Sequence, residues 1–163
     1  MFSFLPDGAV VLGGVAMIEL REINKDNYSE CINLKVSDEQ KGFVASNVFS
    51  LAQAWVFYDN AHPLAIYADN VMVGFILFGP EESDNGMYMN IDRMMIDRQY
   101  QGRGYGKLAF AKLIDIIRND FPYKEIYLSY NPENVVAENL YKRFGFAKTG
   151  EFSGDECIAV LKL

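Results

Sequence analysis

A glycine-rich run at residues 101–106 (Gln-Gly-Arg-Gly-Tyr-Gly) joins a strand-like segment to a helical one and constrains the fold more than any other feature. Three alternating glycines let the backbone turn sharply and approach a ligand closely. The helix predicted after the run begins with unpaired N–H groups and the positive end of its dipole. This arrangement favours a bound phosphate or pyrophosphate, although glycines at such a junction also serve as plain turn residues.

Two common nucleotide-binding motifs are absent from the sequence. There is no GxxxxGK[ST] loop, and the spacing Gly102-x-Gly104-x-Gly106 differs from the dinucleotide fingerprint. The segments before the run read as hairpins rather than as a βαβ unit. Nucleoside triphosphate hydrolysis and NAD binding therefore lose support.

Strand-like and helical patterns follow one another along the chain and predict an α+β domain, with a mixed, mostly antiparallel sheet flanked by helices. Asp69 and Asn70 read as a two-residue hairpin turn, and residues 79–86 read as a loop. No linker or internal repeat is visible, so residues 17–163 are predicted to form one domain. The predicted strands are residues 17–23, 64–68, 71–78, 87–96, 125–130, 146–149 and 157–163, and the predicted helices are residues 26–34, 37–57, 105–119 and 135–144.

The strand predicted at residues 87–96 contains an irregularity. Apolar residues fall on odd positions as far as Ile91, and after Arg93 they fill positions 94–96. A β-bulge shifts the alternation in this way and bends a strand beside a functional site. A strand that enters a fully buried region also loses its alternation. The pattern favours the two explanations equally.

Charge and cysteine usage narrow the function. Asp and Glu number 22 against 15 Lys and Arg, so the formal net charge is −7. This balance disfavours nucleic-acid binding and suits a cationic ligand, although it also serves solubility. A single histidine, His62, and two separated cysteines argue against a zinc site. Two lone thiols suit a reducing cytoplasm.

The first 16 residues differ from the rest of the chain. They carry one charge, Asp7, and an apolar run too short to span a bilayer, and they lack the basic start of a secretory signal. We expect a weakly ordered extension outside the domain, and no membrane association.

Two ordered motifs resemble those of the GNAT N-acetyltransferase superfamily. Residues 91–97 and 100–106 resemble motif A, whose Q/R-x-x-G-x-G/A pattern is met at every fixed position by residues 101–106. The run N-x-x-A-x-x-L-Y-x-x-F-G-F at residues 134–146 resembles motif B. The resemblance covers residues 17–163. It implies the GNAT-like acyl-CoA N-acyltransferase fold and an acetyl-CoA-dependent N-acetyltransferase.

Within that family the sequence most resembles the bacterial spermine/spermidine acetyltransferases. The resemblance implies that the acceptor is a primary amine of a polyamine or diamine. Two alternatives stay open: another amine, such as a protein N-terminus, an amino acid or an aminoglycoside, or a non-catalytic acyl-CoA-binding sensor. The shared features are Leu34-Lys35-Val36, Gln40, Val73-Gly74-Phe75, Asp92-Arg93, Leu128-Ser129 and Gly150-Glu151.

The resemblance also implies residue roles. The glycine run would hold the pyrophosphate of acetyl-CoA, and residues 94–96 would offer backbone groups to the pantetheine arm. Asn134 would contact the cofactor arm, although it also suits a helix N-cap. The predicted cofactor-binding residues are Met94, Met95, Ile96, Gln101, Gly102, Arg103, Gly104, Tyr105, Gly106, Lys107 and Asn134.

Tyr141 is the predicted general acid. A phenol with a pKa of about 10 can protonate a thiolate whose parent thiol has a pKa of about 8.5. The alternative for Tyr141 is ordinary packing on a helix face. For the base, Asp92 ranks ahead of Glu22, Glu81 and Glu82 because it lies beside the predicted bulge; its alternative is a salt bridge to Arg93 or Arg21.

Polyamines are long cations that spaced carboxylates and aromatic faces can bind. A solvated acidic rim is the alternative explanation for any one of these residues. The last two predicted strands could also pair across a homodimer. The predicted acceptor-binding residues are Asp38, Glu39, Trp55, Asp59, Glu81, Glu82 and Tyr88.

Overall fold

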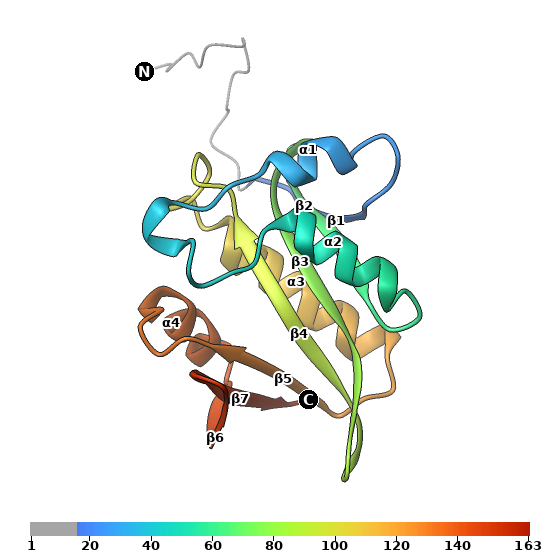
Figure 1. The fold of residues 1–163 in the computed structure, drawn as a ribbon, viewed down its shortest axis with the longest axis vertical. Coiled ribbons are helices and arrows are strands. Elements are labelled where there is room, and N and C mark those ends of the chain that lie inside the picture. The colour runs from blue at the N-terminus through green and yellow to red at the C-terminus, as the bar shows by residue number, and fades with distance from the viewer. Residues whose placement is uncertain (1–15) are drawn as a thin grey trace.

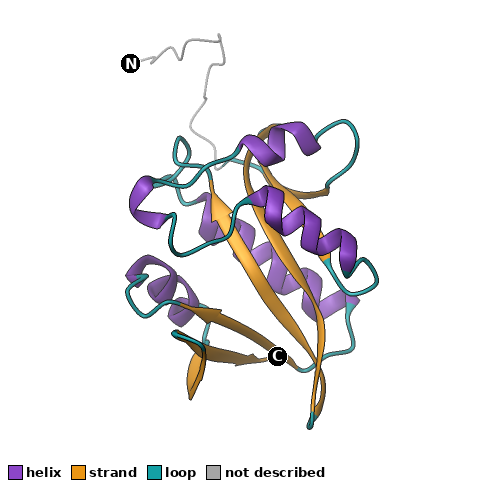
Figure 2. Ribbon diagram, viewed as in Figure 1, coloured by secondary structure: helices purple, strands orange, loops and turns teal. Residues whose placement is uncertain are grey.

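A computed structural model describes residues 16–163 and places seven strands in one mixed sheet, with helices on both faces (Figure 1, Figure 2). The strand order is β1-β2-β3-β4-β5-β7-β6; β4 and β5 run parallel, and the other neighbours run antiparallel. The α+β prediction is confirmed. The extension predicted at residues 1–16 lies, apart from Ala16, outside the described residues.

The elements follow the predicted order with shifted bounds. The strands are β1 (Ile18–Glu22), β2 (His62–Ala68), β3 (Val71–Ser83), β4 (Gly86–Ile96), β5 (Glu125–Tyr130), β6 (Ala147–Ser153) and β7 (Glu156–Lys162). The helices are α1 (Tyr28–Asn33), the 3-10 turn η1 (Asp38–Gln40), α2 (Asn47–Val56), α3 (Tyr105–Asp120) and α4 (Val135–Arg143).

The sheet separates two apolar clusters. One lies between the sheet and α3, where Phe110 and Leu113 pack against strand residues such as Ile76. The other lies between the sheet and the helices α1 and α2, around Phe75. Figure 1 shows α1 and α2 on the near side of the sheet and α3 on the far side. Burial on both faces explains why the central strands read as nearly continuous apolar runs.

The register of β3 and β4 contains the bulge predicted from the sequence. Leu77 pairs with Arg93 and Phe78 with Ile91, so Asp92 is an extra residue without a partner on β3. A bulge of this kind bends the strand and increases its twist.

The bulge also reverses which side chains of β4 face α3. Before it, Met89 and Ile91 belong to the cluster under α3; after it, Met94 and Ile96 pack there, while Met95 joins the opposite cluster. The change in alternation therefore has a local backbone cause, and the bulge explanation is confirmed.

Beyond the bulge, β4 and β5 part. Their parallel pairing covers three residue pairs and ends at Ile91 and Leu128. Past that point the two ribbons diverge, with β5 staying beside β7 (Figure 1). Residues 92–96 of β4 therefore have no strand partner on the β5 side within the described part of the chain.

The single helix predicted over residues 37–57 is wrong. The chain forms η1, then an irregular stretch, and α2 begins after Ser46, whose hydroxyl accepts a hydrogen bond from the Phe49 amide (3.3 Å). We call residues 34–46, between α1 and α2, the connector. A glycine within the connector and a capping serine at its end explain the interruption.

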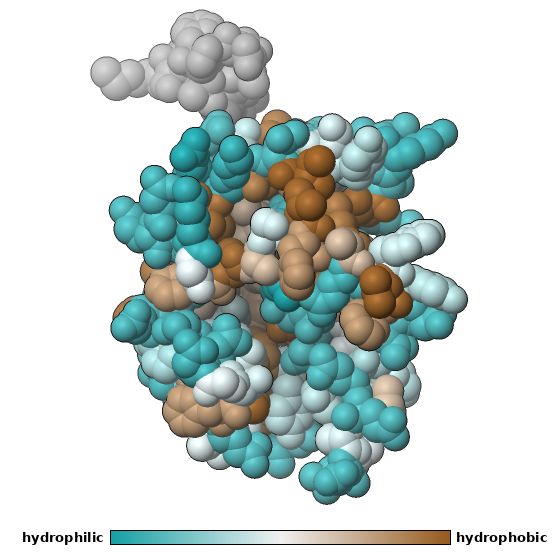
Figure 3. All heavy atoms as spheres, viewed as in Figure 1, coloured by the Kyte–Doolittle hydropathy of each residue, from teal (hydrophilic) through white to brown (hydrophobic). Residues whose placement is uncertain are grey.

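Only some of the apolar side chains of α2 face the core, where Ala54 is buried and Leu51 packs beside it. The side chain of Asn47 is buried and donates a hydrogen bond to the Cys31 carbonyl (2.8 Å), so a polar contact helps to dock α2 against α1. Apolar side chains remain on the outer face, where Trp55 is 79% exposed. Figure 3 shows brown apolar surface over this part of the molecule.

The loop predicted at residues 79–86 is also wrong, because β3 and β4 continue into it as a hairpin. Pro80 pairs with Met89 inside this extension. The neighbouring strand β2 begins at His62, opposite Phe78, so β3 has an open edge at Pro80, a place where a sheet tolerates proline. Glu81 and Glu82 therefore stand on a strand rather than in a loop.

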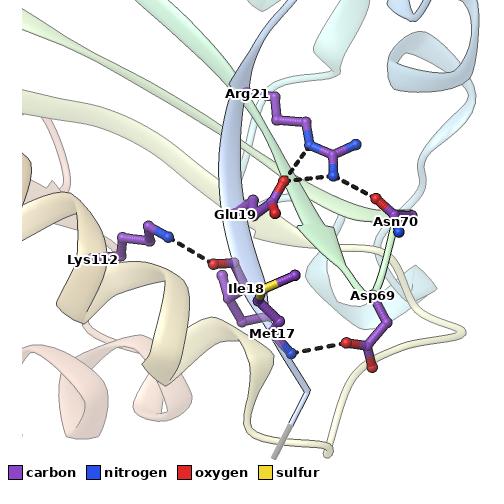
Figure 4. A network of polar contacts seen from close by, with 7 residues as sticks. All are labelled: Met17, Ile18, Glu19, Arg21, Asp69, Asn70 and Lys112. Atoms are coloured by element: carbon purple, nitrogen blue, oxygen red, sulfur yellow. Dashed lines mark hydrogen bonds and ion pairs between the residues drawn. The ribbon is translucent and has the colours of Figure 1, made fainter.

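The two-residue turn between β2 and β3 is confirmed and helps to anchor β1 (Figure 4). Asp69 and Asn70 both have positive φ, as a type I′ turn requires. The Asp69 carboxylate accepts a hydrogen bond from the Met17 amide (2.9 Å), and Asn70 accepts one from Arg21 (2.7 Å). From the other side, Lys112 of α3 donates to a carbonyl of β1 (2.9 Å).

Gly79 provides a test of this packing. A Cβ built there would lie 1.7 Å from the Asn60 backbone oxygen, so the Gly79→Ala substitution must displace the chain between α2 and β2. Overpacking of this kind costs about 1–3 kcal/mol or more. We expect a clearly lower urea midpoint for Gly79→Ala. Gly42→Ala is the control, because nothing lies within 4 Å of a Cβ there; equal midpoints for the two variants would contradict the account.

Candidate active site

A large cavity opens where β4 and β5 part. It has a volume of about 1000 Å³ and is bounded by these strands, the N-terminus of α3, the helix α4 and the connector. We call it the cleft. Every predicted cofactor-binding residue lines it except Arg103.

The glycine run forms an open cradle at the start of α3. Gly102 and Gly104 have φ values of +76° and +82°, a conformation that glycine adopts without strain. No atom lies within 4 Å of a Cβ placed at either position. The first N–H groups of α3, from Tyr105 onward, have no partner within the helix, so they are free to bind an anion.

Gln101 has a structural role in addition to lining the cleft. Its side-chain amide donates to the Gln40 side chain (2.8 Å) and to the Ile96 carbonyl (2.9 Å). Gln40 in turn accepts a hydrogen bond from the Ser37 amide (3.2 Å). This chain of contacts holds the connector against the end of β4.

A buried carboxylate makes a second tie at the same place. Asp97 accepts hydrogen bonds from the amides of Lys35 (2.7 Å) and Gln99 (2.9 Å). The connector is therefore fixed to the end of β4, just before the glycine run.

The two basic side chains of the glycine run differ in position. Lys107 lines the cleft. Arg103 turns back, donating to the Gln99 carbonyl (3.2 Å), with its guanidinium 5.5 Å from the centre of the Tyr100 ring. Arg103 therefore departs from the predicted arrangement, because a local carbonyl and an aromatic face hold it away from the cleft.

Both roles considered for Asn134 and for Tyr141 are compatible with the structure. Asn134 caps α4 by accepting a hydrogen bond from the Ala137 amide (3.2 Å), and it also lines the cleft. Tyr141 packs against Phe110 and Tyr130, with ring centroids 5.3 and 5.4 Å apart, and it too lines the cleft.

The environment of Tyr141 changes its acidity. Burial, and then the charge of Glu156, raise the pKa of the Tyr141 hydroxyl to about 12. The phenol is therefore protonated throughout the neutral pH range.

Asp92 lies at the bulge, within a polar network on β3 and β4. Asn90 donates to both Asp92 (3.1 Å) and Glu81 (3.0 Å), and Tyr88 donates to Glu81 (2.9 Å). Asp92 is exposed to solvent as a residue, and the protein atoms packed around its carboxylate bury part of that group. This burial, and then the charge of Glu81, raise the pKa of Asp92 to about 6.

The salt bridge considered for Asp92 is not formed. Arg21 pairs with Glu19, and no ion pair among residues 16–163 includes Asp92. Arg93 follows Asp92 in the strand, but its guanidinium lies 5.5 Å from the Phe49 ring centre, and its Nη1 is buried without a hydrogen-bond partner.

A second cavity of about 340 Å³ lies beside the bulge, between α2 and the β3–β4 hairpin. Asp92 borders both this cavity and the cleft, and Glu81 and Glu82 line the second cavity as well. The other predicted acceptor-binding residues, Asp38, Glu39, Trp55, Asp59 and Tyr88, line neither cavity.

Several polar residues that were not among the predicted site residues also line the cleft, and two of them, Ser129 and Glu156, contact each other. Ser129 of β5 donates a hydrogen bond to Glu156 of β7 (2.5 Å). They are 27 positions apart, and only the strand register brings them together. The sequence pointed to Ser129 only through the Leu128-Ser129 pair shared with the polyamine acetyltransferases. No sequence feature pointed to Glu156.

Neither cysteine is bonded, and Cys31 and Cys157 are both buried. Within residues 16–163, no group of three or more His, Cys, Asp or Glu side chains could hold a metal ion. None of the described helices is long and apolar enough to cross a membrane.

Comparison with known proteins agrees with this geometry. The Acetyltransferase (GNAT) family model matches residues 17–146. The spermine/spermidine N(1)-acetyltransferase of Bacillus subtilis (strain 168) is 33% identical over 148 residues, which cover 85% of this chain and 95% of the relative.

Solved structures share the fold. A domain from Methanocaldococcus jannaschii matches with a TM-score of 0.73 and 17% identity over 91% of this chain and 99% of that chain. The PaiA N-acetyltransferase from Thermoplasma acidophilum, solved in complex with coenzyme A, matches with a TM-score of 0.66 and 17% identity over 90% and 99%. With its glycine cradle, parted strands and family-model match, this chain belongs to the GNAT acetyltransferase family.

Proposed function

We propose that this acetyl-CoA-dependent N-acetyltransferase acetylates a primary amine of a polyamine or diamine. The observation that carries the proposal is the position of Asp92, which borders both the cleft and the acid-lined second cavity. An extended cation could place its reacting amine at the cleft and its next ammonium group beside Glu81 and Glu82. The relative from Bacillus subtilis, named as a spermine/spermidine acetyltransferase, supports the same class of acceptor.

The residues of the cleft fit acetyl-CoA. The open amides around Gly102 and Gly104, with Lys107 beside them, suit the pyrophosphate. The unpaired side of β4 at residues 94–96 suits the amides of the pantetheine arm, because an extended peptide-like chain can bond to a free strand edge. When bound, acetyl-CoA supplies the thioester whose carbonyl carbon the amine attacks.

The side chains then divide the proton transfers. Asp92, acting through water, is suited to take the first proton from an incoming ammonium group and to hold the cation by its charge. Tyr141 is suited to give its phenolic proton to the sulfur as the thiolate leaves. No hydrogen bond among residues 16–163 engages the Tyr141 hydroxyl, so it is available for this contact.

A second acceptor class has one observation in its favour. Arg93 lines the cleft, and its Nη1 is buried without a hydrogen-bond partner. A guanidinium in this state suits an oxygen ligand, such as the carboxylate of an amino acid or the carbonyl of a peptide N-terminus.

A thiol-release assay with acetyl-CoA and a panel of amines separates these functions. Faster release with spermidine and spermine than with amino acids or peptides is the expected result. Release with peptides or amino acids alone would favour the second acceptor class, in which Arg93 binds an oxygen atom of the acceptor. Tight acetyl-CoA binding with no turnover on any amine would favour a sensor.

Gly104→Ala tests the cradle. The added methyl group occupies the space that the pyrophosphate needs, so we expect the Kd for acetyl-CoA to rise about tenfold, or about 1.4 kcal/mol. Gly150→Ala is the matched control, because its φ of +90° imposes similar backbone strain on β6, away from the cleft. Isothermal titration calorimetry measures both; equal losses of affinity would contradict the cradle.

Tyr141→Phe tests the acid. It keeps the aromatic packing and removes the hydroxyl, so kcat should fall about tenfold or more while the Kd for acetyl-CoA changes little. Tyr127→Phe serves as the control, because Tyr127 does not line the cleft. A Tyr141→Phe enzyme with the kcat of the unmodified chain would remove Tyr141 from the chemistry.

Asp92→Asn tests the cation site through pH. With a pKa raised to about 6, Asp92 is charged above that pH and neutral below it, so kcat/KM for spermidine should fall as pH drops through about 6. Asp92→Asn should show a low value without this inflection, and its KM should depend less on ionic strength. Asp59→Asn, outside both cavities, should behave like the unmodified chain. An unchanged profile in Asp92→Asn would refute the role of Asp92.

A further inference from the structure

One wall of the cleft carries a carboxylate–hydroxyl pair that the proposed function does not yet use. Ser129 is near the end of β5, and Glu156 is the first residue of β7. The register pairs Tyr130 with Cys157, which brings the start of β7 beside the end of β5. Both side chains line the cleft where β5 has already left β4.

The hydrogen bond between them has a useful direction. The Ser129 hydroxyl donates to Glu156 Oε2 over 2.5 Å, and a carboxylate can only accept. The lone pairs of the Ser129 oxygen therefore remain for another donor. No ion pair among the described residues neutralises Glu156.

Tyr141 lies on the same wall. Its ring packs against Tyr130, the neighbour of Ser129, and the charge of Glu156 contributes to its raised pKa. A phenol of raised pKa is a reluctant donor, so a second group that takes up a proton as Tyr141 gives one away would assist it. Asp92 belongs to the opposite wall, on β4, and is suited to the earlier proton.

An ammonium acceptor must lose two protons in all: one before it attacks and one after the new bond forms. We propose that Ser129 and Glu156 form the acceptor for the second proton, with Ser129 contacting the reacting nitrogen and Glu156 acting through it. The assignment rests on the proposed function, because it needs an amine acceptor in the cleft.

The step balances with the groups at hand. The N–C bond forms and the C–S bond breaks. Ser129 takes the proton from the nitrogen as its own proton moves to the Glu156 carboxylate. Tyr141 gives its proton to the sulfur and later regains one from Glu156. The net transfer is one proton from nitrogen to sulfur, and no further reactant is required.

The test compares Glu156→Gln, Glu156→Asp and Ser129→Ala with the control Asp155→Asn, whose side chain is exposed next to Glu156 and lines neither the cleft nor the second cavity. The assay uses whichever amine of the panel the unmodified chain acetylates fastest. Glu156→Gln should lower kcat about a hundredfold. The Kd for acetyl-CoA, the amine KM and the thermal midpoint should change little. Glu156→Asp should recover part of the loss, and Ser129→Ala should lose kcat in the same direction.

Two results would overturn the assignment. One is a Glu156→Gln or Ser129→Ala enzyme with unchanged kcat. The other is a loss of kcat that is accompanied by clear losses of acetyl-CoA affinity and of thermal midpoint. That result would mean that the hydrogen bond between Ser129 and Glu156 only stabilises the pairing of β5 with β7. The proposed function fails separately, if the best amine of the panel is not a polyamine or diamine. No turnover by the unmodified chain with any amine would overturn both.

Discussion

The site depends on the parting of β4 and β5. Three residue pairs hold the two parallel strands together, and the bulge at Asp92 lies one residue beyond the last of them. The bulge turns the rest of β4 so that Met94 and Ile96, rather than odd-numbered residues, face α3. A flat, fully paired sheet would fill this place with ladder hydrogen bonds and leave no strand edge for a ligand. With the extra residue Asp92, a cleft opens between β4 and β5 at the centre of the sheet.

The elements around the cleft divide its chemistry. The glycine cradle and the N-terminus of α3 provide donors for an anion, next to Lys107. The bulge and the β3–β4 hairpin provide the carboxylates of Asp92 and Glu81. The net charge of −7 first read as a general property of the chain, but part of it is gathered where a cationic acceptor would enter. Positive charge at the cradle and negative charge where the cleft meets the second cavity would position two oppositely charged substrates.

Features determined by residues close together in the sequence were predictable, whereas features determined by contacts between distant segments were not. The glycine run, the Asp69–Asn70 turn, the Asn134 cap and the bulge arise from neighbouring residues, and the structure confirms them. The extension of β3 through Pro80 depends on where β2 begins, and the polar contact of α2 depends on its position against α1, so neither was predictable from local pattern. The dimer and the domain boundary remain predictions.

The central claim is that acetyl-CoA binds along the unpaired edge of β4 and in the glycine cradle. Hydrogen–deuterium exchange with and without acetyl-CoA tests it most directly, because it reports on backbone amides at both places. The account predicts slower exchange at residues 93–96 and 102–107, with little change in the β3–β4 hairpin at residues 80–90. Protection confined to the hairpin and the second cavity, with the amides of 93–96 and 102–107 unaffected, would contradict it.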